Sequence, residues 1–258
     1  MLGKVFVASA YVLIAGVGAV HFLRAVPFAA DGSIGAKVGH YYLSTFLLVE
    51  LLLHYSLAVW SDPGFVADAH VGKAEGSFCA ECARVKPLRA HHCRVCRRCV
   101  FEMDHHCPWV NNCVGYRNYR HFWLLLLYLW VSCAYAAALA FGPFFEVVWA
   151  AEHRSIRPTS ERLDRFALTV TFLTTATLGV ALLGYWLWHC FLLVTRRTTI
   201  EFAGGEPPYR PGRAVGAAVR VALQRMLGRR DRWWAVAMVV PPPPKTLPPP
   251  YVLANAAV

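Results

Sequence analysis

The sequence predicts an all-α polytopic membrane protein in which four transmembrane helices flank a Cys-rich module. Of its 258 residues, 57% are hydrophobic and only 16% are charged, whereas soluble domains are typically about 25% charged. A membrane-spanning helix needs about 20 mostly apolar residues. Three of the four qualifying runs contain no Asp, Glu, Lys or Arg, and the other contains only Glu50. The runs are Val5–Leu23, His40–Trp60, His121–Phe145 and Phe166–Thr195.

These runs divide the chain into four parts. The parts are two helices with a short luminal loop (1–60), the Cys-rich domain (61–120), two further helices with a luminal loop (121–195) and a basic, Pro-rich tail (196–258). A secretory signal peptide is the alternative for the first run, because Lys4 precedes it and small residues follow it. Its apolar stretch is longer than the usual signal core of roughly 7–15 residues, so we expect a retained helix. No internal repeat is evident.

Lys and Arg residues collect in two of these parts. The loop 61–120 carries nine of them and the tail after Thr195 carries ten, whereas the opposite side carries Lys37 and four arginines in its loops and Arg24 at the end of the first span. Because positively charged loops stay in the cytosol, we expect both termini and the Cys-rich domain on the cytosolic side. The net charge of +11 then suits anionic membrane lipid and the phosphates of a cofactor. We expect no nucleic acid partner, since the basic residues lie beside the spans and no recognition helix is evident.

Cysteines and histidines are concentrated between Cys79 and Cys113. Seven cysteines and four histidines occur within these 35 residues. The cytosol is reducing, so metal binding or catalysis is favoured over disulfides. The segment has few apolar residues, so bound metal would have to stabilise its fold. Three Cys-x-x-Cys pairs have the spacing with which two thiolates bind one Zn²⁺, namely Cys79 with Cys82, Cys93 with Cys96, and Cys96 with Cys99.

The candidate ligands outnumber what two zinc ions need. Two closed tetrahedral sites use eight ligands, so three of the eleven candidates must be left over. A purely structural zinc module has no need of a spare thiol beside a spare imidazole. A membrane-tethered zinc module without chemistry remains the alternative from spacing alone. The eleven candidates are Cys79, Cys82, His91, His92, Cys93, Cys96, Cys99, His105, His106, Cys107 and Cys113.

The same segment carries a run of motifs that resembles a known family. The motifs are Cys79-x-x-Cys82, Lys86-Pro87, Arg89-Ala90-His91-His92-Cys93, Cys96, Cys99, Met103 to Trp109, Asn111-Asn112-Cys113-Val114-Gly115, Asn118 and Phe122. They are similar to the DHHC-type protein S-acyltransferases, or palmitoyltransferases, named for the tetrad that stands here at residues 104–107. Thr198-Thr199-Ile200-Glu201 resembles the family's Thr-Thr-x-Glu motif. The tail departs from the family, because Ala217 to Gly228 has neither the Asn nor the aromatic residue that many members carry.

The resemblance implies two structural Zn²⁺ ions and divides the ligands between them. His91, His105 and Cys107 are then the three residues left over. The first ion would be held by Cys79, Cys82, His92 and Cys99, and the second by Cys93, Cys96, His106 and Cys113.

The resemblance also implies an activity. A palmitoyl or similar long-chain acyl group would pass from acyl-CoA, the co-substrate, through an acyl-Cys107 intermediate to cysteines of substrate proteins at the membrane. A free thiol titrates near ~8.5, so we expect His105 to take the Cys107 proton and Asp104 to orient His105. One alternative is a zinc-binding scaffold that recruits partners through the tail. Another is a thiol redox protein, which is disfavoured because its Cys-x-x-Cys pairs would all bind zinc.

An acyl chain needs an apolar slot, because each buried methylene contributes ~0.8 kcal/mol. We expect Trp109, Phe122 and Leu125 at the mouth of this slot, and Ser132 near its closed end, about 15 Å further along the third span. Packing against lipid or within the bundle is the alternative for each of them. In the second span Glu50 and His54 are four residues apart and share a face; we expect a structural tie, and lining of the acyl cavity is the alternative.

Two further expectations concern the tail and the compartment. The runs Pro241–Pro244 and Pro248–Pro250 predict polyproline II structure, and a Pro-reading partner protein is the alternative to a stiff, unstructured end. Members of the family occur in Golgi, endoplasmic reticulum and plasma membrane. We expect an endomembrane location, Golgi or endoplasmic reticulum, with the plasma membrane as the alternative.

Overall fold

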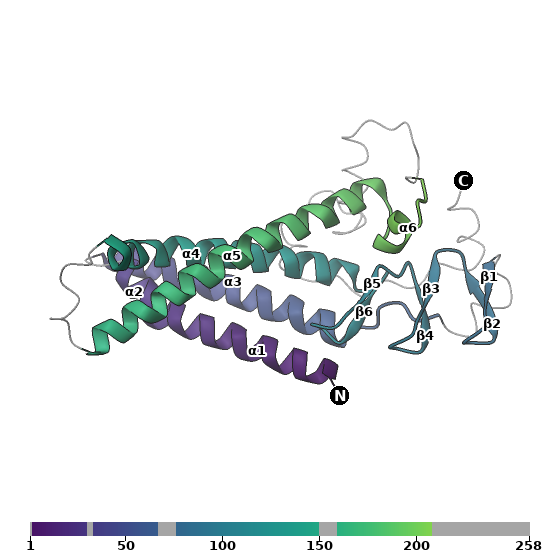
Figure 1. Ribbon diagram of the computed structural model, residues 1–258, viewed down its shortest axis with the longest axis horizontal. Coiled ribbons are helices and arrows are strands. Elements are labelled where there is room, and N and C mark those ends of the chain that lie inside the picture. The colour runs from purple at the N-terminus through teal and green to yellow at the C-terminus, as the bar shows by residue number, and fades with distance from the viewer. Residues whose placement is uncertain (1, 30–32, 67–75, 150–158, 208–258) are drawn as a thin grey trace. The chain divides into compact units, whose positions relative to one another are not determined.

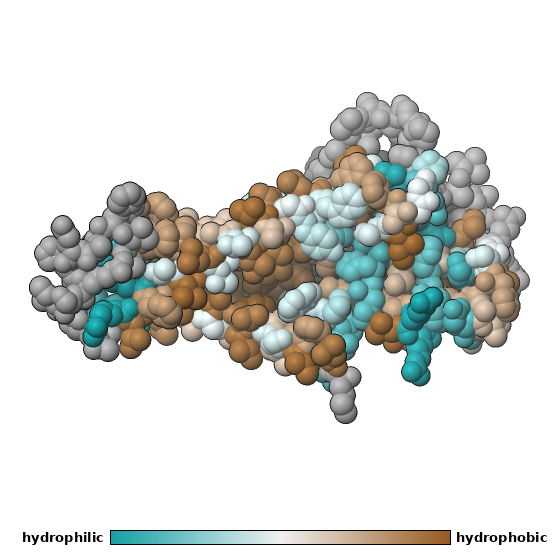
Figure 2. All heavy atoms as spheres, in the orientation of Figure 1, coloured by the Kyte–Doolittle hydropathy of each residue, from teal (hydrophilic) through white to brown (hydrophobic). Residues whose placement is uncertain are grey.

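The computed structural model describes residues 2–29, 33–66, 76–149 and 159–207 (Figure 1). Within them, four helical spans are long and apolar enough to cross a membrane. Apolar side chains gather over the helices in Figure 2, a surface that suits contact with lipid. The expected polyproline runs and the segment 217–228 lie outside the described residues. The spans are α1 (Leu2–Val20) continued by a π-helical turn (His21–Ala25) and α2 (Val26–Ala29), then α3 (Ile34–Trp60), α4 (Tyr119–Trp149) and α5 (Thr159–Thr195).

The chain forms two compact units. The first consists of Met1–Val7, His54–Leu124 and Leu187–Val258, and the second of Ala8–Leu53 and Leu125–Trp186. The second unit is a helical bundle. Ala25, Ala140 and Leu168 form an apolar cluster in it, and an ion pair joins Arg24 to Asp164 at 2.6 Å.

The first unit contains three antiparallel β-hairpins followed, after α5, by the short helix α6 (Thr199–Ala203). Cys79 pairs with Arg84, Cys93 with Arg98, and Cys107 with Asn112, so each hairpin has a turn of the same length. Figure 1 labels the strands of these hairpins, β1 to β6. The hairpins are β1 (Gly76–Cys79) with β2 (Arg84–Pro87), β3 (Ala90–Cys93) with β4 (Arg98–Phe101), and β5 (His105–Cys107) with β6 (Asn112–Val114).

The hairpins reveal a repeat that the sequence analysis missed. The first strand of each hairpin ends at a cysteine, and these three cysteines, Cys79, Cys93 and Cys107, are 14 residues apart. The last residue of each turn has a left-handed backbone, with φ of 51° at Ala83, 54° at Arg97 and 48° at Asn111. In the first two hairpins a second Cys stands three residues after the first, but Val110 takes that position in the third. The third turn therefore keeps the shape of the other two and leaves Cys107 without a Cys-x-x-Cys partner.

The expectation of an all-α chain is wrong for the Cys-rich domain, although the chain as a whole is mostly helical. A period-2 apolar pattern normally identifies strands, but these strands are only three or four residues long. Much of their core also consists of sulfur-bearing side chains, since Cys93, Cys113 and Met103 pack with Val100 in one cluster. A pattern search based on aliphatic residues cannot detect such strands.

Candidate functional site

Two Cys/His clusters lie in the hairpins of the first unit, and each could hold a metal ion. One consists of Cys79, Cys82, His92 and Cys99, and the other of Cys93, Cys96, His106 and Cys113. The ligand atoms of each cluster lie within 4.8 Å of one another. The structure therefore brings together each of the two ligand sets that the family resemblance implied.

The spacing of the ligand atoms fits tetrahedral zinc. With Zn–S bonds of ~2.3 Å, the sulfur atoms at two corners of a tetrahedron are about 3.8 Å apart. In the first cluster the Sγ atoms of Cys82 and Cys99 are 3.7 Å apart, and His92 Nδ1 lies 3.2 Å from Cys82 Sγ. In the second, His106 Nδ1 lies 3.5 to 3.7 Å from the three sulfurs. Burial and the neighbouring thiols raise the pKa of Cys99 to about 12, so a thiolate at this position needs a cation beside it.

Asp104, in the first unit, is fully buried and accepts three hydrogen bonds. The ring Nδ1 of His105 donates to Asp104 Oδ2 at 2.7 Å. The backbone N–H of Thr199 donates to Oδ1, and the Thr199 hydroxyl donates to Oδ2, each at 2.9 Å. Burial alone would raise the pKa of Asp104, but the hydrogen bond from His105, the charges of the nearby histidines and the Thr199 N–H outweigh it and lower the pKa. The carboxylate is therefore ionised and fixed in orientation.

His105 lies between Asp104 and the thiol of Cys107. Burial opposes protonation of the ring, yet the hydrogen bonds with Asp104 and Cys107 and the charges of both groups raise the pKa of His105 to about 9. Cys107 ends β5 and is only 7% exposed. Neither residue belongs to a metal cluster. The three residues form a chain of carboxylate, imidazole and thiol, which is the arrangement used to activate a nucleophile.

Two residues that sequence reasoning missed, His189 and Tyr119, complete the surroundings of His105 beside the expected Phe122. Phe122 packs edge-on against the His105 ring and against the fully buried ring of His189, with centroids 5.1 Å apart in both pairs. Tyr119 places its hydroxyl 2.9 Å from His189 Nδ1. A histidine inside a membrane span is a functional candidate by default, and that rule would have singled out His189.

Helix α6 positions Thr199 through a capping box. The Thr198 side chain accepts from the Glu201 N–H at 3.2 Å, and the Glu201 carboxylate accepts from the Thr198 N–H at 2.8 Å. Arg89, in a left-handed backbone conformation, donates to Glu201 at 2.5 Å and to Glu102 at 2.5 Å. The Thr-Thr-x-Glu motif is thus tied to the Cys-rich domain by a nearly buried ion-pair network, and its second threonine contacts Asp104.

Comparison with known proteins decides the family. Residues 72–205, about half of the chain, match the family model for the DHHC palmitoyltransferase. The chain belongs to the DHHC palmitoyltransferase family. It is 32% identical to mouse palmitoyltransferase ZDHHC16 over 205 residues, which cover 77% of this chain and 57% of that protein.

Other members of the DHHC palmitoyltransferase family are similar over a comparable part. The probable protein S-acyltransferase 16 of Arabidopsis thaliana is 35% identical over 62% of this chain and 60% of its own length. Human palmitoyltransferase ZDHHC20 is 35% identical over 61% of this chain and 42% of its own length. The chain spans about two fifths to three fifths of the length of these curated relatives.

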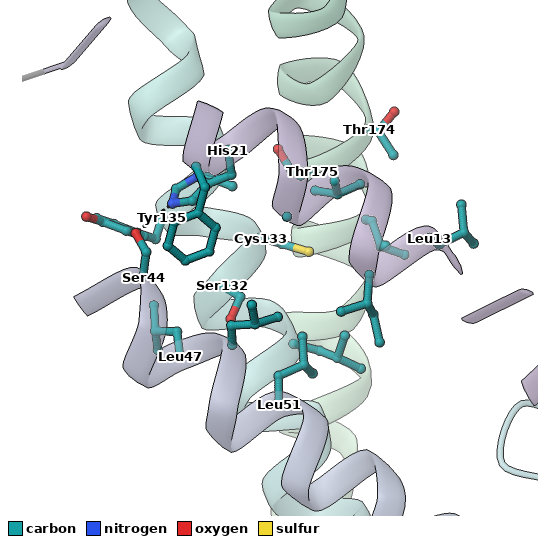
Figure 3. Close-up of a pocket in the computed structure, with 18 residues that line it drawn as sticks. Leu13, His21, Ser44, Leu47, Leu51, Ser132, Cys133, Tyr135, Thr174 and Thr175 are labelled. Atoms are coloured by element: carbon teal, nitrogen blue, oxygen red, sulfur yellow. Dashed lines mark hydrogen bonds between the residues drawn. The ribbon is translucent and has the colours of Figure 1, made fainter. Parts of the chain in front are cut away.

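The residues expected to form the acyl slot of this DHHC protein do not all line one cavity in the structure. Trp109 is 54% exposed; its carbonyl accepts from the Tyr55 hydroxyl at 2.8 Å, and its ring meets Phe6 edge-on at 5.1 Å. Phe122 contacts His105, as described above. Ser132 lines an apolar cavity of the second unit (Figure 3). Leu125 is buried and is not one of the described residues that line this cavity.

The expected tie between Glu50 and His54 stays a prediction, because the two residues belong to different units. The fully buried ring of His54 stacks on His121, with centroids 5.7 Å apart. Glu50 is buried in the second unit.

Proposed function

We propose that this chain is a protein S-acyltransferase that moves a palmitoyl or similar acyl group from acyl-CoA, through acyl-Cys107, to cysteines of substrate proteins. The observation that carries the proposal is the position of Cys107. Its turn has the same shape as the two metal-binding turns, but it belongs to neither cluster and meets His105 instead. Membership of the DHHC palmitoyltransferase family supports the same reaction.

In the first half-reaction the Cys107 thiolate attacks the thioester carbonyl of acyl-CoA. His105 accepts the proton of the Cys107 thiol, and the ionised Asp104 stabilises the resulting imidazolium. The C–S bond to CoA breaks as the new bond to Cys107 Sγ forms, and His105 returns the proton to the departing CoA thiolate. Thioester is exchanged for thioester, so no further reactant is needed.

In the second half-reaction a substrate cysteine gives its proton to His105 and attacks the carbonyl of acyl-Cys107. The Cys107 thiolate leaves, and the acyl group is now attached to the substrate. Zinc in the two clusters would hold β3 to β6 in the folded arrangement that presents His105 and Cys107. His106 acts as a ligand in this proposal, so it takes no part in proton transfer.

We place the Cys-rich domain and both termini on the cytosolic side, where acyl-CoA is available. The excess of Lys and Arg in 61–120 and after Thr195 supports this orientation. A Golgi or endoplasmic reticulum location remains the working hypothesis, and membrane-associated proteins with accessible cysteines are the proposed substrates.

Labelling with acyl-CoA tests the function directly. The full chain is purified in detergent and incubated with radiolabelled palmitoyl-CoA. We expect a hydroxylamine-sensitive label that is abolished in Cys107→Ser and retained in the matched control Cys190→Ser, which removes another cysteine outside the metal clusters. A label that survives Cys107→Ser would show that another residue is the acyl acceptor. Absence of any label in the wild-type protein would favour the scaffold or redox alternatives.

A further inference from the structure

The turn that follows Cys107 has the backbone geometry of a candidate metal-binding turn. Its last residue, Asn111, has a left-handed backbone, and the N–H of Asn111 donates to the carbonyl of Pro108 at 3.1 Å. The first hairpin has the equivalent bond, from the N–H of Ala83 to the carbonyl of Ala80 at 3.2 Å. The turns therefore carry their backbone amides in matching positions, although the third turn has no second cysteine.

In the second hairpin a backbone N–H of the turn points at the sulfur of the first cysteine. The N–H of Cys96 donates to Cys93 Sγ at 3.3 Å. Val110 takes the position of Cys96 in the third hairpin, three residues after Cys107. Because the turns match, the N–H of Val110 is directed toward the region of the Cys107 sulfur.

The peptide group between Trp109 and Val110 is held from its carbonyl side. The hydroxyl of Tyr55, a residue of α3 that is only 4% exposed, donates to the carbonyl of Trp109 at 2.8 Å. The same hydroxyl lies 3.4 Å from the carbonyl of Val7, a longer contact. No cis peptide bond occurs among the described residues, and in a trans peptide group the C=O and the N–H point in opposite directions. The N–H of Val110 therefore points away from Tyr55.

This N–H is buried and lacks an acceptor within the part of the chain that the structure describes. Val110 is 1% exposed, and none of the described residues accepts a hydrogen bond from its N–H. Nearly all buried backbone N–H groups in folded proteins are paired. An acceptor for this N–H is therefore expected from the groups that react at Cys107.

The proposed acyl transfer creates such an acceptor. When Cys107 Sγ bonds to the thioester carbon, the π electrons of the C=O bond move to the oxygen, which becomes negatively charged. When this tetrahedral adduct collapses, the C=O bond re-forms and the C–S bond to the leaving thiol breaks. In the adduct the sulfur of Cys107 is bonded to carbon and no longer carries charge. The neighbouring oxyanion is then the stronger acceptor for an N–H directed at this region.

We propose that the N–H of Val110 is an oxyanion donor in both half-reactions, and that Tyr55 is the residue that positions it. The peptide group is already held by α3 before the reaction, and a preorganised donor needs no rearrangement as the charge develops. The hydrogen bond from Tyr55 also polarises the peptide group, which strengthens its N–H as a donor. The inference rests on the proposed function, because it concerns the transition state of acyl transfer.

Replacement of one backbone N–H tests the donor in the full chain in detergent. Nonsense suppression replaces Val110 by 2-hydroxyisovaleric acid, which keeps the side chain and exchanges the N–H for an ester oxygen. We expect the single-turnover rate of autoacylation by palmitoyl-CoA to fall roughly 10²–10³-fold, the usual cost of losing one oxyanion donor. The matched control is the same replacement at Val95, an exposed valine of the second turn, which should keep the wild-type rate.

Alkylation of Cys107 by iodoacetamide separates this role from support of the thiolate. The reaction needs the thiolate but forms no oxyanion, so its pH profile should be unchanged in the Val110 ester variant. A shift of the profile that accounts for the lost acylation would overturn the proposal and assign the N–H to the thiolate. A wild-type rate of autoacylation in the ester variant would overturn it as well.

Tyr55→Phe tests the positioning residue. We expect the autoacylation rate to fall roughly tenfold, about the effect of one net hydrogen bond, with zinc content, alkylation profile and the Kd for palmitoyl-CoA retained. The matched control is Tyr41→Phe, which removes another hydroxyl of α3 that donates to a backbone carbonyl.

The combination of Tyr55→Phe with the Val110 ester completes the test. Because no N–H remains to be positioned, the double variant should be no slower than the ester variant alone, whereas additive losses would overturn the role of Tyr55. If the wild type is not labelled by any acyl-CoA, the proposed function fails and this inference fails with it. Equal labelling rates of the wild type and the ester variant would refute the inference alone.

Discussion

The contact between Thr199 and Asp104 provides the sharpest test of the catalytic arrangement. Thr199→Val removes one hydroxyl and keeps the branched shape of the side chain. The backbone N–H of residue 199 can still donate to Oδ1 of Asp104, and His105 can still donate to Oδ2. The buried carboxylate therefore keeps two of its three hydrogen bonds and loses the one from the hydroxyl at 2.9 Å.

The size of the effect follows from the charge and burial of Asp104. A hydrogen bond to a charged group contributes about 1.5–3 kcal/mol, which corresponds to roughly 10–150-fold in a rate if the whole contribution is lost in the transition state. Asp104 acts through His105, so the effect cannot exceed that of removing His105, typically ~10²–10⁴-fold for a positioned acid–base group. We expect the rate of autoacylation to fall roughly tenfold to a hundredfold.

The assay is the single-turnover rate of labelling by palmitoyl-CoA, measured beside zinc content and melting temperature. Thr195→Val is the matched control, because the Thr195 hydroxyl donates to the Phe191 carbonyl within α5 and should not affect the rate. A wild-type rate in Thr199→Val, together with a large loss in Asp104→Asn, would refute the argument that this hydroxyl holds the carboxylate. Loss of zinc in Thr199→Val would show instead that the change acts on folding.

Three further predictions concern the tetrad and the cavity. Cys107→Ser should retain two zinc equivalents by metal analysis, because Cys107 lies in neither cluster; release of one equivalent would contradict the ligand assignment. His105→Ala should lower autoacylation by ~10²–10⁴-fold with zinc retained, whereas His106→Ala should release zinc and lower the melting temperature; identical behaviour of the two variants would show that their roles are not divided in this way. Ser132→Phe should shift preference from C16 toward C14 or shorter acyl-CoA in a competition assay, because Ser132 lines the cavity of the second unit; an unchanged C16 preference would place the chain elsewhere.

The sequence by itself determined the features that depend on composition and short spacing. Runs of about 20 apolar residues can satisfy their backbone in lipid only as helices, and all four expected runs lie within the four spans of the structure. The excess of three candidate ligands over eight also follows from counting alone, and it shows that Cys or His residues remain beside the two metal sites. Which residues were left over came only from the family resemblance, since the spacing permits several ligand sets.

The tertiary structure alone decided which distant residues meet. The three hairpins escaped detection because their strands are short and their cores contain cysteine ligands in place of an alternating aliphatic pattern. Thr199 lies 95 residues from Asp104 in the chain, yet it supplies two of the three hydrogen bonds that fix the carboxylate. His189 of α5 lies beside the ring of His105 of β5, with the two ring centroids 6.2 Å apart. Such contacts depend on how hairpins and helices pack, because a local pattern specifies only the face that a side chain occupies and not the residue that meets it.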